Sequence, residues 1–384
     1  MSTGPLAGLT VLDLSRLLPG PFASWLLSDL GARVVKVESP GNPDYLRFLS
    51  DDVEGMHAGF ATLNRGKESV ALHFESEAGA QVLTRMAGRC DVLLESNRPG
   101  VLARFGLDYP RLQAVNPRLI YCSLSGYGQS GGRAQMAGHD LNFLSLLGVT
   151  ALTGEPPRVL GFQMADLTGG MLAALAVLAA LQERHRTGAG RHLDVSLADG
   201  AFTWAALGLA RQLVGAGPEP DLLAGASPGY RYYRCADGAW LGVGGLEPKF
   251  QKRLGALVAD VWEGEWPDEV FTTTDPTLHR KLEEAFARKP RAEWLAAAQD
   301  ACIEPVLTPA EVSRDEWLRE RGLVQTVQGY EQPGSPLAPA FGLTAGTLPP
   351  PPGFHTRAWL QECGYSTAEI AALVENGVAL VAEE

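Results

Sequence analysis

The sequence predicts an α/β fold: a large domain built on a doubly wound, Rossmann-like parallel sheet, beside a smaller α+β domain. Two observations support this prediction. Short apolar strands alternate with helices up to about residue 200. A proline- and glycine-rich stretch then precedes a segment without this regular alternation. A chain of 384 residues is long enough for two domains with separate cores.

The first domain, residues 1–200, opens with a βαβ unit, which normally crosses over right-handed to a parallel neighbour. A buried strand is expected at 9–14, then a helix with Pro21 near its start and Gly31 past its end. Further strands are expected at 34–37, 69–74, 91–95, 119–124 and 192–197, and helices at 77–88, 110–114 and from about 198 to 214.

The rest of the chain divides into three parts. Residues 201–223 read as a linker helix and linker, 224–325 as the small domain, and 326–384 as a return segment that completes the large domain. In the small domain, Ala236-Asp237-Gly238 between two apolar runs predicts a hairpin, followed by helices at 248–257, 276–288 and 292–301. Residues 326–353 predict a long traversing loop, and 355–378 predict two short helices.

Composition excludes several function classes. A formal net charge of −12 argues against a broad surface for nucleic acid. The five cysteines are widely spaced without a C-x-x-C pair, so neither a disulfide framework nor a metal site is expected, and a reducing, cytoplasmic location is. No secretion signal is recognisable, and the apolar run 171–181 is too short to cross a bilayer, so no membrane partner is expected.

Two titratable side chains stand where helices are expected to begin. His139 lies in Gly138-His139-Asp140-Leu141-Asn142, and Asp166 precedes an apolar run expected to be buried on nearly every face. By position alone, Asp166 is an N-cap and His139 a hydrogen-bonded histidine at an element boundary. As a pair, an imidazole and a carboxylate beside a buried helix start suit proton removal next to a carbonyl group. Both interpretations stay open at this point.

Several cations lie close to the expected strands. Lys36 lies in the second strand, Asn64-Arg65-Gly66-Lys67 precedes the third, and Asn97-Arg98-Pro99-Gly100 follows the fourth. Each is a solvated surface charge by default, but together at the carboxyl ends of parallel strands they could dock a pyrophosphate or nucleotide phosphate. The G-x-G-x-x-G run from Gly126 to Gly131 lacks the apolar helix and acidic residue of a dinucleotide site, so a close-approach loop is expected there.

The chain resembles the class III CoA-transferase family of the CaiB/BaiF type, and within it the α-methylacyl-CoA racemase branch, from about Pro5 to Ala379. The resemblance rests on motifs spread over the first domain: 11–16 with 19–23, 31–38, 64–67, 97–100, 117–120 and 125–128. It implies a large domain made from both ends of the chain, a small domain, and a homodimer whose subunits are threaded through each other like links.

The resemblance also implies roles for individual residues. The aspartate that matches Asp166 is the nucleophile of the transferases, where it forms an aspartyl-CoA anhydride, and a base of the racemases. In the racemases the histidine that matches His139 is the opposite base, supported by a glutamate that matches Glu247 in Glu247-Pro248-Lys249-Phe250. The implied CoA-binding residues are the basic, amide and glycine positions of the matching motifs: Arg16, Lys36, Arg65, Lys67, Asn97, Arg98, Gly126 and Gly128.

Three features of the sequence bear on the choice between branches. Transferases carry a run of glycines that leads into the small domain, where this sequence reads Ala224-Gly225-Ala226-Ser227. Racemases carry three consecutive glycines after the aspartate, whereas Met171 follows Gly169-Gly170 here, and the segment between His139 and Asp166 is short. The sequence therefore favours a racemase whose acyl pocket is reshaped.

The expected function is racemisation at C2 of a 2-methyl-branched acyl-CoA, with no cofactor beyond the CoA moiety of the substrate. N–H groups in the first turn of the helix after Asp166 would stabilise the enolate oxygen, and apolar surroundings would raise the pKa of Asp166 toward neutral. The alternatives are CoA transfer between carboxylic acids through Asp166, and a CoA-binding protein without turnover.

Overall fold

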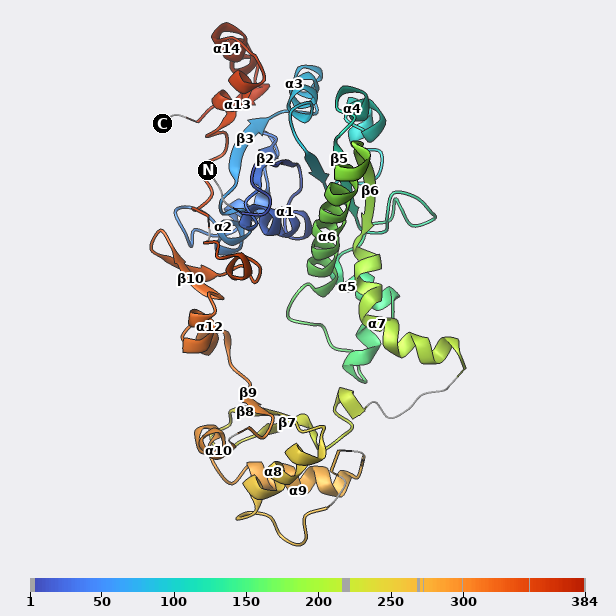
Figure 1. Ribbon diagram of the computed structural model, residues 1–384, viewed down its shortest axis with the longest axis vertical. Coiled ribbons are helices and arrows are strands. Elements are labelled where there is room, and N and C mark those ends of the chain that lie inside the picture. Colours follow the sequence, from blue (N-terminus) through green and yellow to red (C-terminus); the bar gives the residue numbers. More distant parts are fainter. Residues whose placement is uncertain are drawn as a thin grey trace. The chain divides into compact units, whose positions relative to one another are not determined.

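The computed structural model describes residues 4–215, 222–267, 270–271, 273–298, 300–344 and 346–382. The chain forms two compact units (Figure 1). The first comprises Met1–Leu207 and Trp317–Glu384, and the second comprises Gly208–Glu316. The second unit thus begins inside a helix, earlier than the residue 224 that the sequence indicated, and ends at 316 instead of 325.

A seven-stranded sheet forms the centre of the first unit, in the order β12-β3-β2-β1-β4-β5-β6. Its parallel strands are β1 (Thr10–Asp13), β2 (Arg33–Glu38), β3 (Glu68–Leu72), β4 (Val92–Glu95), β5 (Ile120–Ser125) and β6 (Arg191–Ser196). The predicted large parallel-sheet domain is confirmed. The two-residue strand β12 (Ala379–Leu380), antiparallel to β3, was not predicted, because two residues carry no periodic signal.

The strand order reverses between β1 and β4, which lie side by side although two strands separate them in sequence. Open α/β sheets bind ligands outside the carboxyl ends of their strands at such a switch point. The segments that follow β1 and β4 carry Arg16, Asn97 and Arg98. The topology therefore places these three candidate residues at one end of the sheet.

The two faces of the sheet are both covered by helices, as its alternating side chains require. Val11, Val34 and Val92 point to one core, with α1 (Pro19–Asp29), α5 (Asp140–Leu146), α6 (Met164–Thr187) and the start of α7 (Leu197–Leu213). Leu12 and Leu93 point to the other, with α3 (Glu77–Ala87), α4 (Tyr109–Val115), α13 (Thr356–Glu362) and α14 (Thr367–Glu375). Short elements η1 (Tyr45–Phe48), α2 (Ala58–Asn64), η2 (Leu102–Phe105) and η3 (Thr150–Thr153) lie between them in sequence.

The apolar helix α6 packs closely on its neighbours through two glycines. A Cβ at Gly170 would meet the carbonyl oxygen of Pro19 at 2.5 Å, and one at Gly169 would meet Leu197 at 2.4 Å. The expectation that nearly every face of this helix is buried is wrong for one face, where Met171 is 51% and Leu175 61% exposed. Only part of a helix on the outside of a sheet can contact the core.

Among the described residues, α6 is the one helix long and apolar enough to cross a membrane, judged by length and composition. The whole helix has 24 residues and is long enough to cross a bilayer, whereas the apolar run 171–181, on which the expectation of no membrane span rested, is only part of it. Half of its apolar window is buried inside the first unit, where the helix packs on α1 and β5. A core helix passes the same test of length and composition.

The second unit contains a three-stranded antiparallel sheet of β7 (Tyr230–Arg234), β8 (Trp240–Gly244) and β9 (Ile303–Pro305). The turn Ala236-Asp237-Gly238 joins β7 to β8. The helices of this unit are α8 (Pro248–Val258), α9 (Pro276–Phe286), α10 (Arg291–Ala298) and α11 (Pro309–Val312), together with η4 (Leu222–Ala224). In their core, Phe286 stacks on Tyr233 and makes an edge-to-face contact with Trp294.

After α12 (Glu316–Glu320) the chain forms a hairpin, most of which lies within the stretch 326–353 where the sequence predicted only loop. Strands β10 (Val324–Val327) and β11 (Tyr330–Pro333) pair antiparallel. Gln328 and Gly329, with φ of 48° and 90°, form the two-residue turn between them, and such turns match the twist of hairpin strands. The element η5 (Ala338–Phe341) follows. Helices α13 and α14 then return to the large domain as expected, and the unpredicted β12 pairs with β3.

Candidate active site

Two cavities of the first unit share His139 and Asp166 in their walls. The first, called the switch-point cleft here, has a volume of about 550 Å³ and is lined by Arg16, Asn97 and Arg98 among others. The second, the apolar pocket, has a volume of about 250 Å³. Its apolar lining consists of Leu141, Leu144, Val159, Leu160 and Phe162. The imidazole and the carboxyl group therefore stand where a basic cleft meets an apolar pocket.

His139 is the N-cap residue of α5, and its exposed side chain faces both cavities. Its backbone N–H donates to Asn142 Oδ1 at 3.0 Å, which closes the first turn of the helix. The preceding Gly138 is required by packing, because a Cβ there would lie 2.8 Å from both the Tyr127 hydroxyl and the Phe143 ring. Glycine at position 138 therefore lets the backbone pass close to the Tyr127 and Phe143 side chains, and the next residue, His139, lines both cavities.

Asp166 is the third residue of α6 and does not cap it. Asp140, which is buried, accepts hydrogen bonds at its Oδ1 from the backbone N–H groups of Ala165 at 2.6 Å and Asp166 at 3.2 Å. The N-cap function is therefore supplied from α5 across the helix pair. Within the described chain, no group donates a hydrogen bond to the Asp166 carboxylate, which leaves it available for chemistry.

Burial and charge shift the Asp166 carboxyl group toward neutral pH. Burial in the apolar wall raises the pKa of Asp166 to about 6, the negative charge of Asp140 adds to this increase, and His139 opposes it. The predicted direction for Asp166 is therefore correct, and Asp140 is an additional cause. A carboxyl group with a pKa of about 6 can both accept and return a proton near neutral pH.

The structure corrects the expected source of enolate stabilisation. The N–H groups of Ala165 and Asp166 donate to Asp140, and that of Leu167 donates to the carbonyl oxygen of Gln163 at 3.0 Å. These first-turn donors are therefore not free to bind an oxyanion. The N-terminal end of a 24-residue helix still favours negative charge beside it.

Four of the predicted CoA-binding residues line the switch-point cleft: Arg16, Asn97, Arg98 and Gly126. Asn97 is held by buried Glu95, whose Oε2 accepts from the Asn97 backbone N–H at 2.7 Å and from its Nδ2 at 3.2 Å. Gly128 lies apart from the lining residues, with φ of 85° and Asp194 beside it.

Lys36, Arg65 and Lys67 were predicted to line an open crevice, and the structure places all three inside the domain instead. Lys67 Nζ donates to four oxygens, including Asp13 Oδ2 at 3.1 Å and Ser24 Oγ at 2.7 Å. The Arg65 guanidinium pairs with Asp29 at 3.0 Å. Buried aspartates brought in by the fold draw these cations inward, which cation spacing alone does not reveal.

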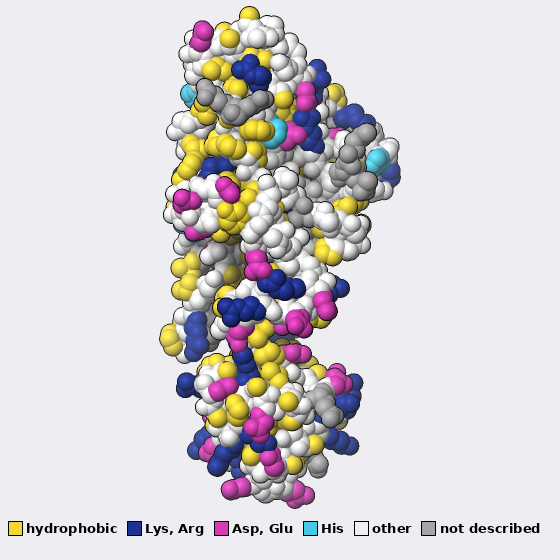
Figure 2. Space-filling view, turned by 90° about the vertical axis from the view of Figure 1, so that its left-hand side faces the viewer, with side chains coloured by type: hydrophobic (Ala, Val, Ile, Leu, Met, Phe, Trp, Pro, Cys, Tyr) yellow, Lys and Arg dark blue, Asp and Glu magenta, His cyan; other side chains and the backbone are white. Residues whose placement is uncertain are grey.

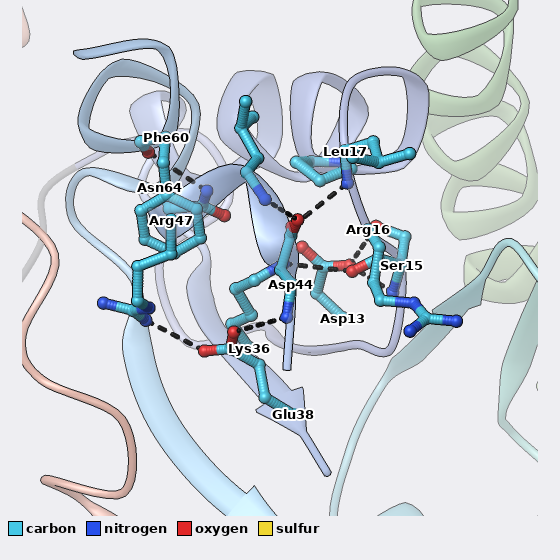
Figure 3. A network of polar contacts seen from close by, with 12 residues as sticks. Asp13, Ser15, Arg16, Leu17, Lys36, Glu38, Asp44, Arg47, Phe60 and Asn64 are labelled. Carbon is cyan, nitrogen blue, oxygen red and sulfur yellow. Dashed lines mark hydrogen bonds and ion pairs between the residues drawn. The ribbon is translucent and has the colours of Figure 1, made fainter. Parts of the chain in front are cut away.

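Lys36 belongs to a buried network that shapes the cleft wall (Figure 3). Its Nζ donates to Asp44 Oδ2 and to the carbonyl oxygen of Ser15, both at 3.0 Å. The same Oδ2 accepts from the N–H of Leu17 at 3.1 Å, a residue held at φ of 65°. A left-handed leucine persists only where its surroundings fix it. The side chain of Arg16 points away from this network (Figure 3) and lines the cleft.

Replacing Lys67 by methionine is expected to lower the free energy of unfolding by about 3–5 kcal/mol, because Asp13 would remain buried without its partner. Burial alone would raise the pKa of Asp13, but Lys67 and Lys36 lower it to about 2. Urea denaturation monitored by circular dichroism measures the loss. The matched Asp13→Asn/Lys67→Met double variant should lose less than Lys67→Met alone. A single variant as stable as the wild type would contradict the structural role.

Glu247 lies in the second unit, where it is the exposed residue before α8. Its assignment as the partner of His139 stays a prediction. Among the described residues, no group of three or more His, Cys, Asp or Glu side chains is placed to hold a metal ion. On the face shown in Figure 2, basic and acidic side chains are interspersed.

Sequence reasoning missed two residues of this site. Asp140 caps α6 and shifts the pKa of Asp166, and its position directly after His139 was the signal that could have found it. Arg158 lines the apolar pocket, although the stretch between His139 and Asp166 gave no indication of its role. Asp140 acts through contacts with Ala165 and Asp166, which are 25 and 26 residues away in sequence, and local patterns do not show such contacts.

Comparison with known proteins agrees with this geometry. The family model of CoA-transferase family III matches residues 6–356. The human alpha-methylacyl-CoA racemase is 39% identical over 96% of this chain and 96% of its own length. The acetyl-CoA:oxalate CoA-transferase of Acetobacter aceti is 33% identical over 87% of this chain and 89% of its own. A CAIB/BAIF family protein from Brucella suis has a TM-score of 0.83 at 30% identity, covering 94% of this chain and all of that structure.

Proposed function

Because the chain belongs to CoA-transferase family III, we propose that it interconverts the two configurations at C2 of a 2-methyl-branched acyl-CoA. One observation carries the proposal: His139 and Asp166 are the residues common to a basic cleft and an apolar pocket. A thioester with CoA in the cleft and its acyl chain in the pocket would place its C2 carbon between the two side chains. The similarity to proteins named alpha-methylacyl-CoA racemase supports the same reaction.

The proposed reaction moves one proton off C2 and another onto it. The thioester carbonyl makes the C2 proton acidic, and the base on that side removes it while the electron pair moves to the thioester oxygen. The resulting enolate then takes a proton from the acid on the opposite face. His139 and Asp166 exchange the roles of base and acid according to the starting configuration, so no cofactor beyond the CoA moiety is needed.

Binding of the CoA moiety would hold C2 in place during the transfer. The exposed side chains of Arg16 and Arg98 in the cleft suit the CoA phosphates, and binding energy from this remote part fixes the reacting carbon. The proposed role of Glu247, to orient the imidazole of His139, rests on the motif Glu247-Pro248-Lys249-Phe250. A homodimer is the proposed working form.

The second candidate is CoA transfer between carboxylic acids. It is favoured by the similarity to proteins named as CoA-transferases and by the Asp166 carboxylate, to which the described residues donate no hydrogen bond. In that reaction the Asp166 carboxylate would attack the thioester carbonyl, displace the CoA thiolate and hold the acyl group as an anhydride. The thiolate would then attack the Asp166 carbonyl of this anhydride, which releases the first acid and leaves aspartyl-CoA. The acceptor acid would take the CoA by the same two steps in reverse. The exposed imidazole of His139 at the same site has no required part in it, which is why racemisation is preferred.

The test is to incubate one enantiomer of a 2-methylacyl-CoA with the protein and no acceptor acid, then to separate the products by chiral chromatography. Racemisation predicts both configurations. A parallel incubation adds a carboxylic acid as acceptor, and another adds hydroxylamine, which converts an activated Asp166 carboxyl group to a hydroxamate that mass spectrometry detects on the protein. Formation of a new thioester and of this protein-bound hydroxamate, with the starting configuration kept, would overturn the proposal in favour of CoA transfer.

The pH dependence follows from the pKa of Asp166. In the direction in which Asp166 removes the proton, kcat/KM should fall about tenfold per pH unit below pH 6, because only the carboxylate form is a base. Asp140→Asn keeps an oxygen that can cap α6 but removes the negative charge that raises the pKa of Asp166. The inflection should therefore move to lower pH in this variant. An unchanged inflection would contradict the assignment of Asp166 as that base.

A further inference from the structure

The apolar pocket contains a cation for which the proposed reaction has no use. Arg158 lines this pocket beside Val159, Leu160 and Phe162, and its side chain is exposed. Within the described part of the chain, no carboxylate lies within ion-pair distance of its guanidinium. The guanidinium is therefore exposed and free to pair with an anionic group of a ligand that enters the pocket.

The position of Arg158 relative to the reacting groups separates it from CoA. Arg16 and Arg98 line the switch-point cleft, whereas Arg158 lines only the apolar pocket, and His139 and Asp166 stand between the two cavities. A thioester that passes between the two bases therefore meets Arg158 at its acyl end.

The backbone holds Arg158 at this place. Its N–H donates to Thr153 Oγ1 at 2.8 Å, and that hydroxyl donates to the carbonyl oxygen of Thr150 at 2.7 Å. The loop that carries Arg158 is thereby tied to η3, whose first residue, Thr150, also lines the apolar pocket. The root of the side chain is fixed, so the guanidinium can reach only a limited part of the pocket.

We propose that the acyl group of the substrate ends in a carboxylate that Arg158 binds, so that the substrate is the CoA thioester of a 2-methyl-branched dicarboxylic acid. The inference rests on the proposed function and adds the chemistry of the chain end. A guanidinium presents two parallel N–H donors that match a carboxylate. A volume of about 250 Å³ holds roughly eight water-sized groups, so a short chain is enough to bring its end to the pocket wall.

A purely structural role for Arg158 predicts different results. Its aliphatic stem could cover the apolar lining while the charge stays in water. Arg158→Met keeps an apolar stem and removes the charge, whereas Arg158→Lys keeps the charge and loses the two parallel N–H donors of the guanidinium. Arg186→Met, at the exposed end of α6, serves as the matched control for loss of an arginine elsewhere.

The experiment compares two 2-methylacyl-CoA thioesters of equal chain length, one ending in a methyl group and one in a carboxylate. Wild type should racemise the carboxylate-ended thioester with a kcat/KM at least tenfold higher, as expected for a charge-assisted hydrogen bond of about 1.5–3 kcal/mol. Arg158→Met should remove this preference and change kcat/KM for the methyl-ended thioester less than threefold. Arg158→Lys should keep part of it, and Arg186→Met all of it.

Two results would overturn the inference: no preference in the wild type, or a preference that survives in Arg158→Met. Dissociation constants of both thioesters, measured by calorimetry on wild type and Arg158→Met, decide the question without turnover. If neither thioester is racemised but the carboxylate-ended one binds at least tenfold tighter to the wild type alone, the proposed reaction fails and the carboxylate site stands. Equal binding overturns the site whatever the reaction is.

Discussion

Replacing His139 by alanine is expected to lower the rate of racemisation by about 10²–10⁴-fold, the usual contribution of a positioned acid or base. The exposed imidazole is one of the two groups common to the switch-point cleft and the apolar pocket. Without it, one face of C2 has no proton donor or acceptor. The measurement is kcat for conversion of each enantiomer, followed by chiral chromatography.

The His139→Ala variant should lose turnover but still bind the substrate. His139 caps α5 through its backbone, so alanine keeps the hydrogen bond from residue 139 to Asn142, and the dissociation constant for acyl-CoA should change little. His139→Gln, which has no titratable group, should be as inactive as the alanine variant. A His139→Ala protein that racemises at more than a tenth of the wild-type rate would exclude the imidazole from the reaction.

Replacing Asp166 by asparagine is expected to lower racemisation by a similar factor of about 10²–10⁴ and to stabilise the protein. The folded-state pKa of about 6 lies above the unfolded value near 3.9, so the ionised carboxyl group opposes folding at neutral pH. Asparagine removes that penalty. We expect a gain of about 2–3 kcal/mol in the free energy of unfolding at pH 7, at about 1.4 kcal/mol for each pH unit between the two pKa values.

The sign of this effect gives an internal control. Well below the unfolded pKa, Asp166 is protonated in both states, so the stability difference between the variant and the wild type should vanish at about pH 3. Urea denaturation at about pH 3 and about pH 7 measures both values. A variant that is less stable than the wild type at pH 7 would show that the ionised carboxyl group stabilises the fold. That result would contradict the conclusion that burial and Asp140 disfavour the ionised form of Asp166.

Most of the large domain could be predicted from sequence, because its signals are local. The parallel strands β1 to β5 are short runs of mostly buried residues such as Val34-Val35, and α3 begins at a serine cap. The hairpin β10–β11 was missed because its prolines and glycines outweighed a four-residue alternation. Strand β12 was missed because only its pairing with β3 makes it a strand.

The candidate site was predicted in part, and the errors have one cause. His139, Asp166, Arg16 and Arg98 line the two cavities, and each was noticeable in the sequence because it follows a strand or begins a helix. Lys36, Arg65 and Lys67 were placed outside although they lie inside, because the buried aspartates that bind them are distant in sequence. Residue spacing identifies the elements that carry charged side chains, but tertiary packing decides which of these side chains form ion pairs.

The most direct test of the two-base account is hydrogen exchange at C2 in heavy water, starting from a single enantiomer of a 2-methylacyl-CoA without an acceptor acid. If His139 and Asp166 act from opposite sides of the carbon, mass spectrometry and chiral separation should show deuterium at C2 in the product of inverted configuration. An unlabelled C2 that keeps its configuration, with an acyl group trapped on Asp166, would contradict the account.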